Sequence, residues 1–443
     1  MKHPFLAFAS LALALGSARA APVGAMPVYS ELPSPLDIRG AIGFALDHNY
    51  AILQAREAVR QQEGVVVQVT SQQIPNVSAQ GQWQRNAAQI SEIYPPSNEL
   101  WQLELKATQT LYAGGGVHSS IKGARLTRDA AALDLQAAVD AALLDVRTKF
   151  YNVILAREKI RVEEENVRLY EHQLEDTRNQ FEAGTVSNFE VLRAKVYLAN
   201  AQPNLITARN TYRIAVEQLR QSLGTPGSSP FPEVVGDLNF ETASYDMDSA
   251  IASAHEHRPE LQKLDKLEAA GEESVTTAKS SFYPSVQAFG AYEWSGFNYV
   301  DPVFGSVSAN GWLFGVQSNW AIFDGRATVG KVRQAKSQLE QARIAKASEE
   351  LEVDVEVRQT LSSLQEAGEL VTASRQTIDQ AAEALRLAEA KFHAGSATQL
   401  DVLTSQVALT QAKTDQLTAN YNYLVALANV RKAIGLSDAL VRP

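Results

Sequence analysis

The chain has 443 residues, no cysteine and 50 acidic against 40 basic residues, for a formal net charge of −10. The lack of cysteine excludes disulfides, thiolate metal sites and a lipidated N-terminal cysteine. The acidic balance, without a basic patch, argues against nucleic acid as a partner.

The N-terminus has the pattern of a secretory signal peptide. Lys2 and His3 precede the apolar run FLAFASLALALG, and Ala18-Arg19-Ala20 forms a small-residue cleavage site. We therefore expect residues 1–20 to be removed. This loss of Lys2 and Arg19, with no acidic residue, lowers the formal net charge from −10 to −12. No later stretch is apolar for the ~20 residues of a membrane helix, so none is predicted in the mature chain.

The rest of the chain consists of two similar sequence repeats. The stretch FEAGTVSNFEVL from Phe181 matches FHAGSATQLDVL from Phe392, and SQQIPNVSAQG from Ser71 matches SSFYPSVQAFG from Ser280. A period this long indicates a duplicated domain. We expect the following segments: an extended segment at 21–36, a first repeat at 37–224, a linker at 225–246, a second repeat at 247–435 and a short tail at 436–443.

Each repeat begins with a predicted helix, about 37–73 in the first, and continues with two predicted strands. The strands are expected at about 76–85 and 100–112, then at about 285–299 and 311–323, because apolar and polar residues alternate there. Such runs approach the ~9–11 residues that cross a bilayer. All five tryptophans fall in these segments: Trp83, Trp101, Trp294, Trp312 and Trp320.

Tryptophan belts at strand ends are typical of membrane barrels. The alternative is an ordinary antiparallel sheet with one wet face. Four strands cannot close a transmembrane barrel, so the barrel reading requires an oligomer, and three copies would supply twelve strands.

A very long helix follows each pair of strands. From Gly116 to Ala183 there is no proline, and an apolar residue recurs at every seventh position from Val139 to Phe181. The second copy keeps this spacing from Val357 to Phe392. A strict seven-residue repeat predicts left-handed supercoiling, and each helix would be ~100 Å long.

Each long helix is expected to turn sharply into a shorter one. Gly184 and Gly395 are predicted to end the long helices, and the next helix in the first copy is expected at about 188–223. In each repeat, the two short helices would lie end to end along the long one.

Together these features resemble the TolC family of outer-membrane efflux and secretion ducts, over essentially the whole mature chain. The resemblance rests on the paired motifs at Phe181 and Phe392, the HRPEL stretch from His257, and the turns YAGGG and FDGR. The first copy departs from HRPEL because Tyr50 replaces the proline. The implied fold class is mainly α with a β-barrel portion.

The resemblance implies a homotrimer in the outer membrane of a Gram-negative bacterium. Its twelve-stranded barrel would contact outer-membrane lipid and continue into the periplasm as a twelve-helix tunnel. The family resemblance also implies passive export, driven by an inner-membrane pump and joined to it by a periplasmic adaptor. The turns Gly184-Thr185 and Gly395-Ser396 would then dock the adaptor's helical hairpins.

Two acidic residues follow the turns. Glu190 and Asp401 are repeat equivalents, and both fit a capping box that starts at Ser187 or Thr398. They could also form acidic rings at a closed tunnel mouth. By resemblance, Asp401 matches the acidic constriction and a second acidic position falls on Thr404, which is uncharged. Capping is the favoured reading for Glu190, and both roles stay open for Asp401.

No enzyme signature is present. His255-Glu256-His257 lacks the spacing of a helical metal site, and there is no phosphate loop, nucleophile elbow or catalytic carboxylate pair. We expect no cofactor and no metal. The predicted function is the exit duct of a tripartite efflux or type I secretion system; the alternative is an elongated periplasmic coiled-coil protein without a pore. Drug, metal-ion and polypeptide cargo are all compatible with this architecture.

Overall fold

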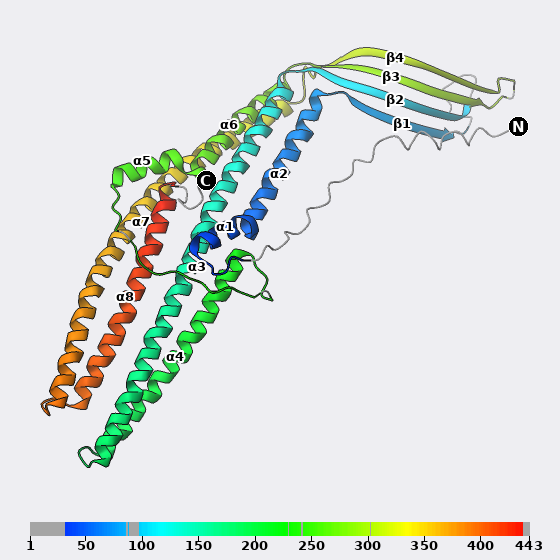
Figure 1. Ribbon diagram of the computed structural model, residues 1–443. Helices are drawn as coiled ribbons and strands as arrows, with labels where there is room; N and C mark the ends of the chain where they lie inside the picture. Colours follow the sequence, from blue (N-terminus) through cyan, green and yellow to red (C-terminus); the bar gives the residue numbers. More distant parts are fainter. Residues whose placement is uncertain are drawn as a thin grey trace.

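The computed structural model describes residues 32–85, 87, 97–228, 230–240, 242–301 and 303–436. The molecule is elongated, with a four-stranded sheet at one end and two long helical hairpins extending away from it (Figure 1). The first repeat contains α1 (Ile38–His48), α2 (Tyr50–Thr70), a short 3₁₀ turn (Ser71–Gln73), β1 (Asn76–Arg85), β2 (Ser97–Ala113), α3 (Gly116–Glu182) and α4 (Asn188–Leu223). The second contains α5 (Met247–His257), α6 (Pro259–Ser280), β3 (Ser285–Tyr299), β4 (Ser306–Asn319), α7 (Ala327–His393) and α8 (Gln399–Ala433).

The two long helices have the predicted length and the predicted buried stripe. Both α3 and α7 contain 67 residues, or ~100 Å at the rise of an α-helix. Their seven-residue positions include Val146 and Val153 on α3 and Val357 and Leu364 on α7, all of them buried. Val146 and Val153 share a buried cluster with Leu219 of α4, and Val357 and Leu364 share one with Tyr423 of α8, so the stripe packs on the returning helices.

The single helix expected at about 37–73 is divided in the structure. It is broken at Asn49, whose backbone is extended. The side chain of Asn49 accepts hydrogen bonds from the N–H groups of Ala51 (2.9 Å) and Ile52 (3.3 Å), which restarts the helix as α2. A capping side chain thus does here what a proline does at the start of α6.

The short helices of each repeat meet end to end at these breaks, as expected. Asn49 Nδ2 donates to the carbonyl of Ser222 at the end of α4 (2.7 Å). In the second repeat, Ser253 Oγ donates to the carbonyl of Ile434 just after α8 (3.0 Å). Gly224, with φ +73°, presses against the backbone of α1, and a Cβ there would lie 2.3 Å from His48 O.

The second break uses a different buried residue. Arg258 occupies the position of Asn49 and is 3% exposed. Its Nη1 donates to Glu356 on α7 (2.5 Å), and its guanidinium also reaches Glu260 on α6 (3.4 Å). A charged side chain buried this deeply needs such partners, because desolvation is costly. One joint is therefore neutral and the other ionic.

An apolar cluster lies halfway along α3, where the segment between the repeats crosses it. Val234 from that segment packs with Phe150 and Ile154. Arg157 fixes the crossing, since its Nη1 donates to the carbonyl of Val234 (2.7 Å) and its Nη2 to that of Gly236 (2.8 Å).

The contact between Gly224, at the end of α4, and the backbone of α1 is expected to leave no room for a side chain at position 224. Gly224→Ala combines a left-handed backbone with a clash against a carbonyl, which together cost about 2 kcal/mol or more. We expect a lower thermal midpoint in far-UV circular dichroism of the purified protein. Gly227→Ala is the matched control, because nothing lies within 4 Å of a Cβ at that position. Equal midpoints for the two variants would contradict this view of the joint.

Candidate channel and membrane-facing sites

The sheet is antiparallel throughout, in the order β1-β2-β3-β4 (Figure 1). Four tryptophans share one of its faces. Directly opposed residues lie on the same face, and the register pairs Trp83 with Trp101 and Trp101 with Gly296. Trp294 is two residues from Gly296 and so lies on this face as well. Trp312 joins them, because it is opposite the residue two positions before Trp294.

The other face is mostly polar. By the same register, it carries Gln80, Gln82, Gln102, Glu104, Lys106, Gln287, Glu293 and Gln317. The apolar exceptions on this face are Leu100, Phe289, Phe297, Val307 and Leu313. The ring of Phe289 covers Gly315, where a Cβ would lie 2.9 Å from a ring atom. Lys106 Nζ lies 5.7 Å from the centroid of that ring. The sheet is therefore amphipathic, with an aromatic face and a water-compatible face.

Both edges of the sheet are unpaired in the part of the chain that the structure describes. β1 and β4 are its outermost strands, and no other part of the described chain pairs with their outer edges. Each open edge presents a row of backbone N–H and C=O groups that a further strand would satisfy.

The predicted bounds of the last strand were wrong. The strand expected at about 311–323 is observed at Ser306–Asn319. Its partner β3 starts at Ser285, which pairs with Asn319, and the preceding Pro284 has no N–H to extend the ladder. Trp320 therefore lies just beyond the strand, where its Nε1 donates to the carbonyl of Phe282 (3.0 Å). β2 begins slightly earlier than predicted, and β1 and β3 have the expected bounds.

A second apolar belt surrounds the junctions between strands and helices, and of its members only Trp320 was predicted from the sequence. Its exposed members are Ile74, Leu111, Tyr112, Phe282, Tyr283, Trp320, Ile322 and Phe323. From Gly296, level with Trp101, to Ser285 at the base of β3, the strand is ~36 Å long. At the ~40° tilt of barrel strands this is ~28 Å along the axis, close to the ~25 Å apolar band of membrane barrels.

The two hairpin tips are closed by the predicted glycines. Gly184 and Gly395 have φ +78° and +75°. The N–H of Thr185 donates to the carbonyl of Gln180 (2.9 Å), and that of Ser396 donates to the carbonyl of Lys391 (2.8 Å). These are the long-range bonds of a Schellman turn. All four predicted docking residues, Gly184, Thr185, Gly395 and Ser396, are exposed.

Of the two capping boxes predicted beyond the tips, only the second one forms. The capping box predicted at Ser187 does not form: Ser187 makes no side-chain cap, and Glu190 pairs with Arg193 instead. The second box does form, with Asp401 Oδ2 accepting from the N–H of Thr398 (2.7 Å). Arg193, one turn after Glu190, competes for its carboxylate.

In the second copy, the residue one turn after Asp401 is the uncharged Thr404, whose hydroxyl donates to its own helix at Leu400 O (2.8 Å). Hydrogen bonds from the Thr398 side chain, then from its backbone, lower the pKa of the Asp401 carboxyl below its ordinary 3.8. Asp401 is exposed and negatively charged at neutral pH.

Polar contacts tie the two hairpins of one chain together along α3 and α8. Gln399 Nε2 donates to Thr177 Oγ1 in a buried contact near the tips (2.7 Å). Further along, Thr410 Oγ1 donates to Asn166 Oδ1 (3.2 Å). Lys413 Nζ then pairs with Glu165 on the surface (2.9 Å). Sequence patterns did not reveal these ties, because each joins residues far apart in the chain.

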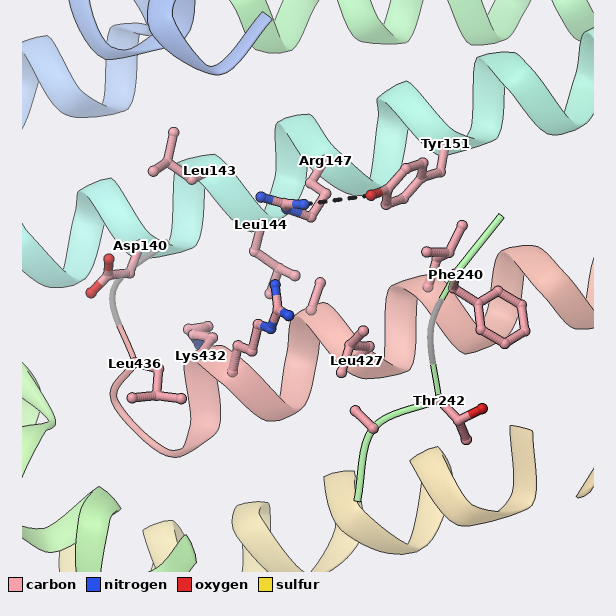
Figure 2. A pocket seen from close by; sticks show the side chains of 14 residues that line it. Asp140, Leu143, Leu144, Arg147, Tyr151, Phe240, Thr242, Leu427, Lys432 and Leu436 are labelled. Atoms are coloured by element: carbon pink, nitrogen blue, oxygen red, sulfur yellow. Dashed lines mark hydrogen bonds between the residues drawn. The ribbon is translucent and has the colours of Figure 1, made fainter. Parts of the chain in front are cut away.

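Above these ties, α3, α8 and the inter-repeat segment enclose a pocket of about 390 Å³ (Figure 2). Arg147 and Tyr151 line its α3 side, joined by a bond from Arg147 Nη1 to the phenol oxygen (3.4 Å). Lys432, in the last turn of α8, and Leu436, just beyond that helix, line the opposite side.

His255 and His257, which were not expected to bind a metal, contact different partners. His255 Nε2 contacts Asp354 on α7 (2.8 Å), and His257 Nδ1 contacts the carbonyl of Ser253 (3.1 Å). Among the residues with described positions, no group of three His, Cys, Asp or Glu is arranged to hold a metal. None of the described helices combines the length and apolar composition needed to cross a membrane.

Two long helical hairpins that continue into an amphipathic sheet define the class of outer-membrane channel proteins. The chain belongs to the outer membrane efflux protein family, whose model matches residues 41–225 and 250–436. It is accordingly an outer-membrane protein that extends into the periplasm, and members of this family are channel proteins rather than enzymes.

Individual relatives agree with this assignment. Nodulation protein T of Rhizobium leguminosarum bv. trifolii is 24% identical over 317 residues, covering 71% of this chain and 67% of that protein. Outer membrane protein TolC of Escherichia coli (strain K12) is 25% identical over 332 residues, covering 68% of this chain and 64%, just under two thirds, of TolC. The solved structure of CusC, described as forming a transmembrane channel, has the same fold, with a TM-score of 0.78 at 16% identity over 93% of this chain and 96% of CusC.

The capping box at Thr398 is expected to hold the start of α8 in place. Thr398→Val removes the hydroxyl that accepts from Asp401 N, and losing about 1 kcal/mol of capping speeds local amide exchange about fivefold. Hydrogen-exchange mass spectrometry of the second tip measures this. Ser187→Ala is the matched control at the first tip and is expected to change nothing, since Ser187 makes no side-chain cap.

The same box sets a pH dependence. The pKa of Asp401 is lowered in the folded protein, so its contribution is complete above the ordinary value of 3.8 and is lost as the pH falls through the folded-state pKa. Exchange protection at the second tip is therefore expected to stay constant down to about pH 4 and to fall below it. A loss of protection between pH 7 and 5 would contradict the assignment.

Proposed function

We propose that three copies of the chain close into a twelve-stranded barrel in the outer membrane, continued by a twelve-helix tunnel in the periplasm. The tube is the passive exit duct of a tripartite efflux or type I secretion system. The observation that carries this proposal is the four-stranded sheet, which has one aromatic face, one polar face and two open edges.

Lipid offers no hydrogen-bond partners, so a spanning sheet must leave no backbone edge unpaired. A four-stranded sheet with two open edges satisfies this only by joining β1 of one copy to β4 of the next. Three copies give twelve strands, within the range of known barrels. The aromatic face then meets lipid, and the glutamine-rich face lines a wet lumen.

The helical hairpins continue this lumen away from the membrane. Because the sequence carries no phosphate-binding loop, energy for export must come from a partner: an inner-membrane pump that delivers substrate through a periplasmic adaptor. The exposed tips at Gly184-Thr185 and Gly395-Ser396 are the adaptor-docking surface in this proposal, and the duct itself needs no cofactor. A coiled-coil stalk without a pore is disfavoured, because it has no use for an amphipathic sheet with the height of an apolar bilayer band.

Closure of the barrel can be tested with introduced cysteines, since the native chain has none. Gln80→Cys on the polar face of β1 is combined in turn with cysteine at each odd-numbered position from 307 to 317, on the same face of β4. At least one combination is expected to give covalent trimers on a non-reducing gel after oxidation. Phe314→Cys, on the aromatic face, is the control. Outer membranes in which no same-face pair crosslinks would rule out this closure.

The tunnel mouth can be tested at Asp401. Threefold symmetry would repeat its charge as a ring, so Asp401→Ala is expected to raise single-channel conductance or to abolish block by a trivalent cation. Thr398→Val is the control, because it disrupts the cap and keeps the charge. If Asp401→Ala leaves both conductance and block unchanged in planar bilayers, the ring is absent. If the two variants behave alike, the cap rather than the charge controls the mouth.

A further inference from the structure

Positive charge gathers where the helices meet the base of the sheet (Figure 1). These junctions comprise residues 64–75, 114–122, 274–284 and 320–333, which include the ends of α2 and α6 and the starts of α3 and α7. They contain five basic residues and one acidic residue, although the whole chain has a formal net charge of −10. The basic residues form an exposed basic collar: Lys122, Lys279, Arg326, Lys331 and Arg333.

Most of the charge of the basic collar is not neutralised within the chain. Lys122 pairs with Glu273 on α6 (2.6 Å). Within the described part of the chain, the other four collar side chains form no ion pair. The one acidic residue of the junctions, Asp324, is engaged at the start of α7, where its Oδ2 accepts from the N–H (2.7 Å) and the hydroxyl (2.5 Å) of Thr328. The collar therefore offers positive charge to a partner outside the chain.

The duplication places cations at the same two levels in both repeats. Lys122 of α3 and Arg333 of α7 are repeat equivalents, and so are Arg125 and Lys336, which lie about one turn further from the sheet. All four side chains are exposed. In a trimer, each of these two levels would carry six positive charges around the tube.

The basic collar lies at the depth of lipid headgroups. Phe323 belongs to the apolar belt at the strand–helix junctions and is followed three residues later by Arg326. Lys331, Arg333 and Lys122 lie ~6–9 Å along their helices from the first helical residue. The headgroup layer beside the hydrocarbon core is ~5–8 Å thick, and charges act over a further Debye length of ~8 Å. These cations are thus within range of headgroup phosphates.

The opposite end of the sheet has the opposite charge. The connections between strands at that end, residues 84–100 and 297–306, contain one basic and three acidic residues. The basic one, Arg85, lies 3.8 Å from the carboxylate of Glu99. Because the charge changes sign between the two apolar belts, a general need for charged surface does not explain the basic collar.

We propose that the basic collar binds the anionic phospholipid headgroups of the periplasmic leaflet of the outer membrane. The proposal rests on the barrel proposed above and adds the class of lipid that its periplasmic end selects. Lys and Arg form charge-assisted hydrogen bonds with phosphate oxygens, and their long stems can lie along the apolar belt while their charged groups reach the headgroups. A headgroup with a net negative charge is favoured over a zwitterionic one of similar size. These contacts also fix the depth of the barrel, because movement toward the lipid core would bury the collar charges.

Lipid preference can be measured by fluorescence quenching, since Trp320 lies at the base of the sheet beside the basic collar. The native protein is reconstituted in phosphatidylcholine vesicles that contain a rising share of brominated phosphatidylglycerol or brominated phosphatidylcholine. The difference between the native protein and Trp320→Phe gives the signal of Trp320. At low salt, phosphatidylglycerol is expected to bind at least tenfold better, because each Lys or Arg near the headgroups contributes about fivefold. At 1 M salt, where the Debye length is ~3 Å, the preference is expected to vanish.

Substitutions in the collar test its role directly. Lys331→Gln with Arg333→Gln is expected to lower the preference for phosphatidylglycerol at least fivefold, whereas Lys331→Arg with Arg333→Lys keeps both charges and the preference. Lys195→Gln with Arg375→Gln is the matched control, because it removes two exposed charges from helix segments far from the sheet. A collar variant that alters the ion selectivity of the channel and leaves the lipid preference unchanged would place the collar in the lumen and overturn the proposal.

The salt dependence of the native protein keeps the proposal testable if a collar variant misfolds. Equal quenching by the two brominated lipids at low salt would overturn the role of the collar and leave the duct intact. If neither brominated lipid quenches any tryptophan of the reconstituted protein, the sheet does not enter lipid, and the proposed function itself fails.

Discussion

A sheet that enters lipid cannot leave its backbone edges bare, and the rest of this molecule follows from that constraint. Unpaired N–H and C=O groups cost several kcal/mol each where no water can reach them. A chain with only four strands meets that demand through its own copies. Trimerisation is thus a condition for entering the membrane in the proposed duct, and the shape of the periplasmic part inherits the same threefold order.

The duplication gives one chain two nearly equal helical hairpins, but the polar contacts of the two repeats differ. At the helix breaks, a neutral Asn49 joint in one half corresponds to the buried, ion-paired Arg258 in the other. Near the tips, Glu190 pairs with Arg193 in the first turns of α4, whereas Asp401 completes the capping box at the start of α8. The backbone frame is shared, and the polar chemistry along it is particular to each half.

Features set by local chemistry could be predicted from the sequence. Period-seven and period-two patterns located the long helices and most strands, and a positive φ explains Gly184 and Gly395. Features that depend on a distant residue could not. The end of β4 depends on Pro284, which precedes the partner strand β3, and the polar ties between α3 and α8 join residues of different repeats. The pairing of Glu190 with Arg193 is local, but the capping pattern at Ser187 does not account for that competitor. The roles of the tips and of Asp401 in docking and gating stay predictions, because they depend on other copies or other proteins.

The equal lengths of α3 and α7 determine how far the two hairpin tips lie from the sheet. Both span 67 residues, so in the proposed trimer all six tips would stop at nearly the same depth below the sheet. A partner would meet a level rim rather than a staggered one. An insertion in one long helix alone would tilt that rim and shift its buried stripe out of register. Length changes in relatives of this architecture should therefore occur in both helices together, and in steps of about seven residues.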